Sequence, residues 1–192
     1  MGFLDALLGR TKPVQPNLDV LFAVPSAAYT LQAALDFAPT GAGAVCFKAA
    51  EGGAAARSQS EILDLLDLDP ALEVSLDHDE YGYTWITCRQ SVVDLSALVT
   101  ALHAVNAVLA DAGFGPNLLC TVVGFRAGGD DRPRRLALVY LFKRGTVYPF
   151  APTGGQQRDT TLEMQVRARL AAELPIEAEL ERWFPIWNAP GP

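Results

Sequence analysis

The sequence is poor in the residues from which most metal, redox and hydrolytic sites are built. It contains three cysteines and two histidines among 192 residues. Cys46, Cys88 and Cys120 are odd in number, lie far apart and each stand in an apolar, strand-like stretch. This pattern indicates neither a disulfide framework nor a metal cluster. We therefore interpret the three cysteines as buried, reduced thiols.

Positive charge is also scarce. The 15 Lys and Arg residues are outnumbered by 22 Asp and Glu residues, which gives a net charge of −7. Because this charge repels phosphate backbones and anionic lipids, we expect no nucleic-acid partner. Half of the residues are apolar, which is enough for one domain with a sizeable core.

The sequence offers no evident membrane or export segment. No apolar run approaches the roughly 18 residues that a membrane-spanning helix needs. The N terminus has no charged region followed by an apolar stretch and a small-residue cleavage site. We therefore expect a cytoplasmic protein.

Catalytic motifs are missing as well. No Gly-x-Ser-x-Gly nucleophile elbow occurs, and no glycine cluster has the spacing that cradles a phosphate group. His78 lies between Asp77 and Asp79, but adjacent strand residues point to opposite faces, so only a tight turn could bring these ligands together on a metal. A solvated hairpin tip is the preferred interpretation. A small metal-dependent hydrolase is the remote alternative, and we expect no catalytic residue and no cofactor.

Residues 1–16 are expected to form an N-terminal arm and linker. Pro13 and Pro16 separate the first ten residues from the chain that follows. The arm either packs on the core or docks on a partner, and its few basic residues allow at most weak peripheral membrane contact. Four apolar side chains share one helical face of the arm, namely Phe3, Leu4, Leu7 and Leu8.

Periodicity and capping signals predict alternating helices and strands along the rest of the chain. Asp94 is a good N-cap for the longest helix. The pairs Ser58 with Glu61 and Thr160 with Glu163 have the spacing of capping boxes. We predict helices over residues 26–36, 58–69, 94–112 and 160–174, and strands over residues 43–48, 72–77, 81–90, 118–126, 136–143 and 146–150.

This order of elements predicts an α+β fold in which helices cover an antiparallel sheet. The connections between successive strands are short, which favours an antiparallel pair followed by a three-stranded meander. We assign residues 17–174 to a single domain and residues 175–192 to a tail rich in Pro and Trp. The element order resembles that of type III secretion chaperones and YbjN-like proteins, a likeness that implies architecture and not activity.

Two segments are typical of contact surfaces. Residues 143–152 place aromatic side chains between prolines, and residues 182–187 place three large aromatic side chains near the chain end. The tail either latches onto its own core or anchors a partner. The candidate contact residues in the two segments are Tyr148, Phe150, Trp183, Phe184 and Trp187.

Five stretches of the chain carry a further signal, namely residues 1–10 (MGFLDALLGR), 102–106 (LHAVN), 114–116 (FGP), 143–152 (KRGTVYPFAP) and 182–185 (RWFP). Together they resemble the PspAB family, the PspA-associated proteins of actinobacteria. The resemblance implies a non-enzymatic accessory of an envelope-stress response in which PspA-type coiled-coil proteins guard the cytoplasmic membrane. It implies no catalytic residue, cofactor or metal.

The preferred hypothesis is an adaptor that binds a PspA-type coiled-coil protein in the cytoplasm or at the inner face of the membrane. The alternative is a chaperone-like homodimer that holds an extended peptide in a groove.

Overall fold

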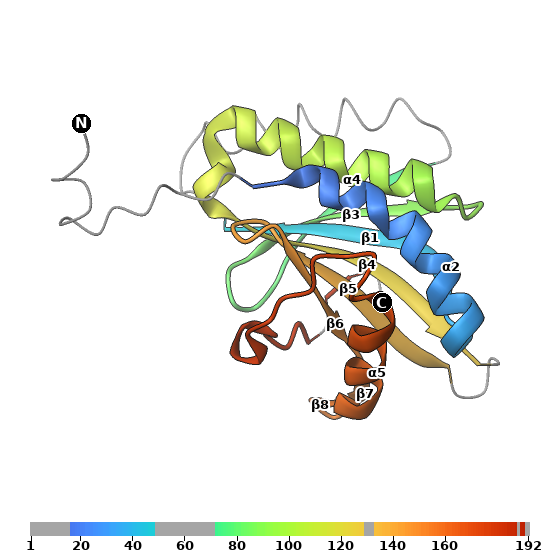
Figure 1. Ribbon diagram of the computed structural model, residues 1–192. Helices are drawn as coiled ribbons and strands as arrows, with labels where there is room; N and C mark the ends of the chain where they lie inside the picture. The colour runs from blue at the N-terminus through green and yellow to red at the C-terminus, as the bar shows by residue number, and fades with distance from the viewer. Residues whose placement is uncertain (1–15, 49–71, 129–132, 188, 191–192) are drawn as a thin grey trace, which may run out of the picture.

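A six-stranded antiparallel sheet organises the chain (Figure 1). The computed structural model describes residues 16–48, 72–128, 133–187 and 189–190. The sheet strands are β1 (Ala38–Phe47), β2 (Leu72–His78), β3 (Thr84–Gln90), β4 (Leu118–Ala127), β5 (Arg134–Leu141) and β6 (Thr146–Phe150). A small hairpin is formed by β7 (Pro152–Gly154) and β8 (Gln157–Arg158).

Three α-helices and several short helical turns complete the fold. The α-helices are α2 (Val24–Leu35), α4 (Leu95–Leu109) and α5 (Thr160–Leu170). The short turns are η1 (Leu18–Ala23), η2 (Ala110–Phe114), η3 (Gly115–Asn117) and η4 (Leu180–Arg182). The predicted α+β class with an antiparallel sheet is therefore confirmed.

The strand order is β2-β3-β1-β4-β5-β6. The predicted hairpin of β2 and β3 and the predicted meander of β4, β5 and β6 are both confirmed. β1 lies between these two units and pairs antiparallel with β3 and with β4. The proposed likeness to type III secretion chaperones and YbjN-like proteins stays a prediction.

Helices cover one face of the sheet, which we call the first face. α2 and α4 lie across this face, and α5 packs at its β6 side (Figure 1). Leu31 of α2 and Leu102 of α4 are fully buried against sheet residues such as Val45 and Phe125. Burial of such side chains is the main favourable term in folding, at roughly 1.5–3 kcal/mol each.

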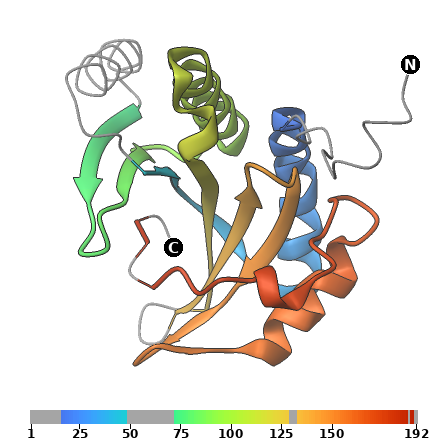
Figure 2. The same cartoon turned by 90° about the vertical axis from the view of Figure 1, so that its left-hand side faces the viewer.

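The opposite, second face of the sheet is covered by the C-terminal tail. Figure 2 shows the tail running from α5 across this face toward the β2–β3 hairpin. Val122 and Val139 of the second face are fully buried, and Trp183 of the tail is buried with them. The sheet therefore has an apolar core on each side.

The N-terminal helical segment is longer than predicted. η1 leads directly into α2 at Val24, with a proline in its first turn and no side-chain cap, so the expected start at Ser26 is wrong. The predicted end is confirmed, because Asp36 adopts a left-handed conformation with φ of 62°.

β1 also begins earlier than predicted, at Ala38 rather than residue 43. The pairing with β4 shifts register between Pro39 and Gly43, and Gly41 within that bulge has a φ of 75°. Glycine adopts this conformation without steric cost, so the bulge lets the residues before Gly43 belong to the same strand.

The β2–β3 turn also differs from the prediction, because β3 begins at Thr84 and not at residue 81. The Oδ1 atom of Asp79 accepts two hydrogen bonds, from the backbone N–H groups of Tyr81 and Tyr83, both at 2.9 Å. This short side chain curls the backbone and delays the strand.

The two capping predictions had different outcomes. Asp94 caps α4 as predicted, with its Oδ1 accepting from the N–H of Ala97 at 3.0 Å. The cap of α5 is Asp159 and not Thr160, because Glu163 turns inward instead of reaching back to the helix start. α5 also ends at Leu170, earlier than predicted. The helix predicted over residues 58–69 lies outside the described residues.

Close contact between α4 and β1 generates a stability prediction. A Cβ atom on Gly43 would lie 2.7 Å from Leu102 Cδ1 and 2.8 Å from the carbonyl oxygen of Val122. We expect Gly43→Ala to lower the free energy of unfolding by about 1–3 kcal/mol, the usual cost of overpacking a core. Thermal melting checks this, with Gly115→Ala as control because its nearest atom is 4.0 Å away. Equal melting temperatures for the two variants would contradict the expectation.

Candidate interaction surfaces

The solvent side of α2 and α4 is unusual because it carries no charge. Neither the 12 residues of α2 nor the 15 residues of α4 include Asp, Glu, Lys or Arg. Surface helices of soluble proteins normally place charged residues opposite their buried stripe. We call this surface the outer helix face and define it by the exposed residues Phe22, Ser26, Tyr29, Ala33, Ser96, Ala97 and Thr100 together with the half-buried Ala104 and Ala107.

Two large aromatic side chains stand out on this face. Tyr29 is 76% exposed and Phe22 is 49% exposed. The seven-residue separation places them on the same side of the segment, two helical turns apart. The Phe22 ring lies 4.7 Å from the His103 ring, and this contact joins η1 to α4. His103 Nε2 in turn lies 3.8 Å from Asp19.

Acidic residues lie at the helix ends that border this face. Asp19 lies in the first turn of η1 and Asp36 follows α2, and Asp94 and Asp111 lie on either side of α4. All four are exposed. The surface is therefore a neutral, small-residue area with two aromatic side chains and an acidic margin.

Phe22 and Tyr29 are not among the contact residues predicted from the sequence. Helical periodicity indicates the buried stripe, whereas the signal for this face is the absence of charged residues at the remaining positions. That signal is present in the sequence of residues 24–35 and 95–109.

The contact residues predicted from the sequence are found in different environments. Phe3, Leu4, Leu7 and Leu8 of the arm lie outside the described residues. Tyr148, Phe150 and Trp183 are buried between the second face and the tail. Trp187 is half-buried with its ring 5.1 Å from that of Phe150, and Phe184 is 59% exposed. Phe184 is thus the one most accessible to another chain among the described candidates.

The tail begins by extending the sheet. The N–H of Val147 in β6 donates to the carbonyl of Pro175, and the N–H of Glu177 donates to the carbonyl of Val147, both at 2.9 Å. Residues 175–177 therefore run parallel to β6 and cover its open edge. An uncovered edge strand can pair with other chains, so this contact also protects the sheet.

A buried carboxylate holds the start of the tail in place. Glu177 has a side chain that is 1% exposed, and it accepts hydrogen bonds from Arg144 Nε at 3.0 Å and from Thr146 Oγ1 at 2.7 Å. Burial alone would raise the pKa of Glu177. The hydrogen bonds from Arg144, Thr146 and the Glu179 N–H, together with the positive charge of Arg144, outweigh burial and lower the pKa to about 2.

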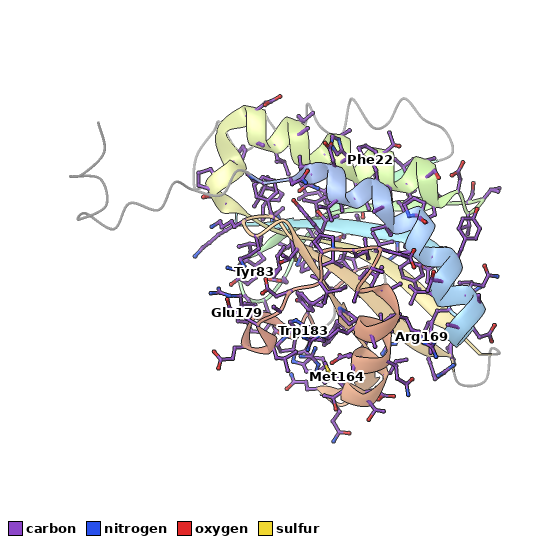
Figure 3. All side chains as sticks on the ribbon, in the orientation of Figure 1. Phe22, Tyr83, Met164, Arg169, Glu179 and Trp183 are labelled. Carbon is purple, nitrogen blue, oxygen red and sulfur yellow. The ribbon has the colours of Figure 1, made fainter. Side chains whose placement is uncertain are left out.

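Further along the tail, Trp183 packs against the second face of the sheet. Its ring stacks on Tyr148 with centroids 5.9 Å apart, and its Nε1 donates to the carbonyl of Glu177 at 3.1 Å. The Tyr148 hydroxyl donates to the carbonyl of Phe184 at 2.8 Å. Arg158 Nη1 donates to the carbonyl of Trp183 at 2.8 Å while its Nε binds the buried Glu163. Figure 3 shows Trp183 on the side of the sheet away from Phe22.

His78 and Asp79, which the remote hydrolase alternative would need, form hydrogen bonds within the β2–β3 hairpin. His78 Nδ1 lies 3.1 Å from the Thr84 hydroxyl, and Asp79 accepts from the Trp85 indole at 3.0 Å. Burial would raise the pKa of Asp79, but hydrogen bonds from Trp85, Tyr83 and Tyr81 lower it. In the part of the chain that the structure describes, no group of three or more His, Cys, Asp or Glu could hold a metal ion.

Two open hollows occur on the described surface. The larger, about 290 Å³, lies beside the β1 bulge and includes Glu73, Arg89 and Gln90 in its lining. The smaller, about 100 Å³, lies between the β7–β8 hairpin and the tail and includes Trp187. Neither lining contains a His or Cys that could act as a nucleophile or general base.

Two helical segments are long and apolar enough to cross a membrane by length and composition, namely Leu18–Leu35 and Leu95–Asn117. By this measure the expectation that no apolar segment approaches that length is wrong. Both segments pack against the sheet in this fold, and core helices of soluble proteins pass the same test. The finding therefore assigns no membrane span.

The fold and surfaces define an α+β protein whose distinctive features are exposed neutral helices and an aromatic tail. A family model described as PspA associated protein B, PspAB, matches residues 1–191. The chain belongs to this family. The family name indicates an association with PspA, which is consistent with an accessory role. No curated protein and no solved structure matches the chain.

The environment of Glu177 generates a pH prediction. A carboxyl whose folded pKa is lowered stabilises the fold above its ordinary pKa of 4.5, and this stabilisation is lost as pH falls toward about 2. We expect Glu177→Gln to cost about 1–3 kcal/mol at neutral pH, the usual cost of disturbing a buried hydrogen-bonded group. The difference in melting temperature between native and variant proteins should shrink from pH 5 to pH 2. Glu181→Gln, on an exposed tail residue, is the control. A difference that does not change with pH would contradict the assignment.

Proposed function

We propose that this protein is a non-enzymatic adaptor that binds a PspA-type coiled-coil protein through its outer helix face. The observation that carries the proposal is the absence of charged residues from α2 and α4 together with the exposure of Phe22 and Tyr29. Membership of the PspA associated protein B family supports PspA as the partner.

The chemistry of the face suits a helical partner. Exposed small residues of α4, such as Ala97 and Thr100, allow the backbone of a second helix to approach closely. Tyr29 supplies a rigid aromatic anchor of the type that dominates binding energy in protein interfaces. The acidic margin favours a partner whose apolar helical stripe is bordered by Lys or Arg residues.

The N-terminal arm and the exposed part of the tail are further contacts in this proposal. The arm contributes Phe3, Leu4, Leu7 and Leu8, and the tail contributes Phe184. In this proposal the protein acts in the cytoplasm, and its position at the inner face of the membrane follows from its partner. No catalytic step is part of this function.

A charge placed on the outer helix face tests the proposal directly. We expect Tyr29→Glu to weaken binding to a purified PspA-type protein from the same genome by at least about tenfold, because a charge would be buried at an aromatic contact. Isothermal titration calorimetry measures the dissociation constant. The variant should fold normally because Tyr29 is 76% exposed.

Met164→Glu is the matched control, since Met164 is an exposed apolar residue of α5, 37% accessible and away from the outer helix face (Figure 3). Equal affinities for the two variants would exclude the outer helix face as the contact. Light scattering on the same samples would show whether the chain forms the homodimer of the chaperone-like alternative.

Removal of the arm tests its contribution separately. We expect a chain that lacks residues 1–12 to recover less PspA-type protein than the full chain in crosslinking pull-downs from stressed cells, because the apolar face of the arm is gone. Its melting temperature should remain close to that of the full chain. Unchanged recovery would remove the arm from the proposed contact.

A further inference from the structure

Two cysteines meet on the second face of the sheet, and the adaptor function does not use them. Cys46 of β1 and Cys120 of β4 are direct partners across the antiparallel pair. Directly opposite residues project to the same face, with Cα atoms about 4.5–5.5 Å apart. This separation falls within the range of about 4.4–6.8 Å that a disulfide requires. The two thiols are free and buried, and the neighbouring Cys120 side chain raises the pKa of Cys46.

The pair belongs to a row of residues that crosses the sheet and ends at the tail. At one end, the Trp85 indole donates to Asp79 of the β2–β3 hairpin. At the other end, the Thr146 hydroxyl donates to Glu177, which holds the start of the tail. From β3 to β6 the row consists of Trp85, Cys46, Cys120, Leu141 and Thr146.

With the tail in place, the pair is protected from reaction. Cys46 is 3% exposed and Cys120 is 7% exposed, and both belong to the core that includes Trp183 of the tail. The Cys120 side chain and burial both raise the pKa of Cys46. Because the thiolate is the attacking species in thiol chemistry, Cys46 is unreactive in this state.

The third cysteine provides an internal reference. Cys88 is fully buried in the core on the first face, beneath the helices and away from the tail. Burial raises its pKa to about 12. Release of the tail would uncover the second face only, so Cys88 should stay protected unless the whole domain unfolds.

We propose that Cys46 and Cys120 form a dithiol modification site, which closes to a disulfide across β1 and β4 when the C-terminal tail leaves the second face. The oxidant is a low-molecular-weight disulfide. One cysteine thiolate attacks it, which forms a mixed disulfide and releases one small thiolate. The second cysteine thiolate then attacks the protein sulfur of the mixed disulfide and releases the second small thiolate. The two cysteine protons pass to the two released thiolates, so atoms and electrons balance.

The test exposes the full chain to glutathione disulfide at neutral pH, blocks remaining thiols under denaturing conditions with N-ethylmaleimide, and analyses peptides by mass spectrometry. We expect a Cys46–Cys120 disulfide, recognised by the loss of two hydrogen atoms, with Cys88 recovered as the maleimide adduct. In Trp183→Ala the disulfide should form at least about tenfold faster than in the native chain, because the tail opens more often. Glu177→Gln should act in the same direction without removing an aromatic side chain.

Three outcomes would overturn the proposal. The first is the accumulation of stable mixed disulfides on Cys46 or Cys120 without the cross-strand product. The second is an equal oxidation rate in the native chain, Trp183→Ala and Glu177→Gln, which would show that the tail does not control access. The third is reaction of Cys88 at the same rate as the pair, which would show that global unfolding exposes all three thiols. Cys46→Ser serves as control and should leave Cys120 unable to form an intramolecular disulfide with Cys46.

Discussion

Burial of both sheet faces is the constraint on which the rest of the structure depends. Antiparallel sheets commonly leave one face in water, with apolar and polar residues alternating along each strand. Here the central strands are apolar on both sides, as in β1, where Ala44 faces the second core and Val45 faces the first. Each face therefore needs its own cover. The helices supply one cover and the C-terminal tail supplies the other.

This requirement makes the tail an integral layer of the domain. Aromatic burial alone would not specify how a short segment lies on a sheet, because the hydrophobic effect is not directional. Hydrogen bonds supply the direction: the Thr146 hydroxyl donates to Glu177, Arg158 donates to the carbonyl of Trp183, and the Tyr148 hydroxyl donates to the carbonyl of Phe184. Trp183 and the aromatic residues beneath it are buried within the chain itself, whereas Phe22 and Tyr29 of the outer helix face and Phe184 of the tail remain exposed.

Much of the fold could be predicted because its signals are local. Asp94 caps α4, and the turn between β5 and β6 follows from Arg144-Gly145, where Gly145 has a φ of 66°. Predictions failed where a distant contact overrode the local pattern. Glu163 has the spacing of a capping box with Thr160, but it binds Arg158 and the N–H of Ala151 instead. The neutral surface of α2 and α4 was readable from the sequence, whereas its continuity across two helices was not.

By itself, the sequence determined the types of element, their order and the acidic, motif-poor character of the chain, because propensity, periodicity and charge are properties of short segments. Only the tertiary structure decided that β1 lies between β3 and β4, that Cys46 faces Cys120, and that Trp183 covers Tyr148. These arrangements join residues that are far apart in the chain. Their free energy comes from mutual burial and pairing, which no local stretch of sequence specifies.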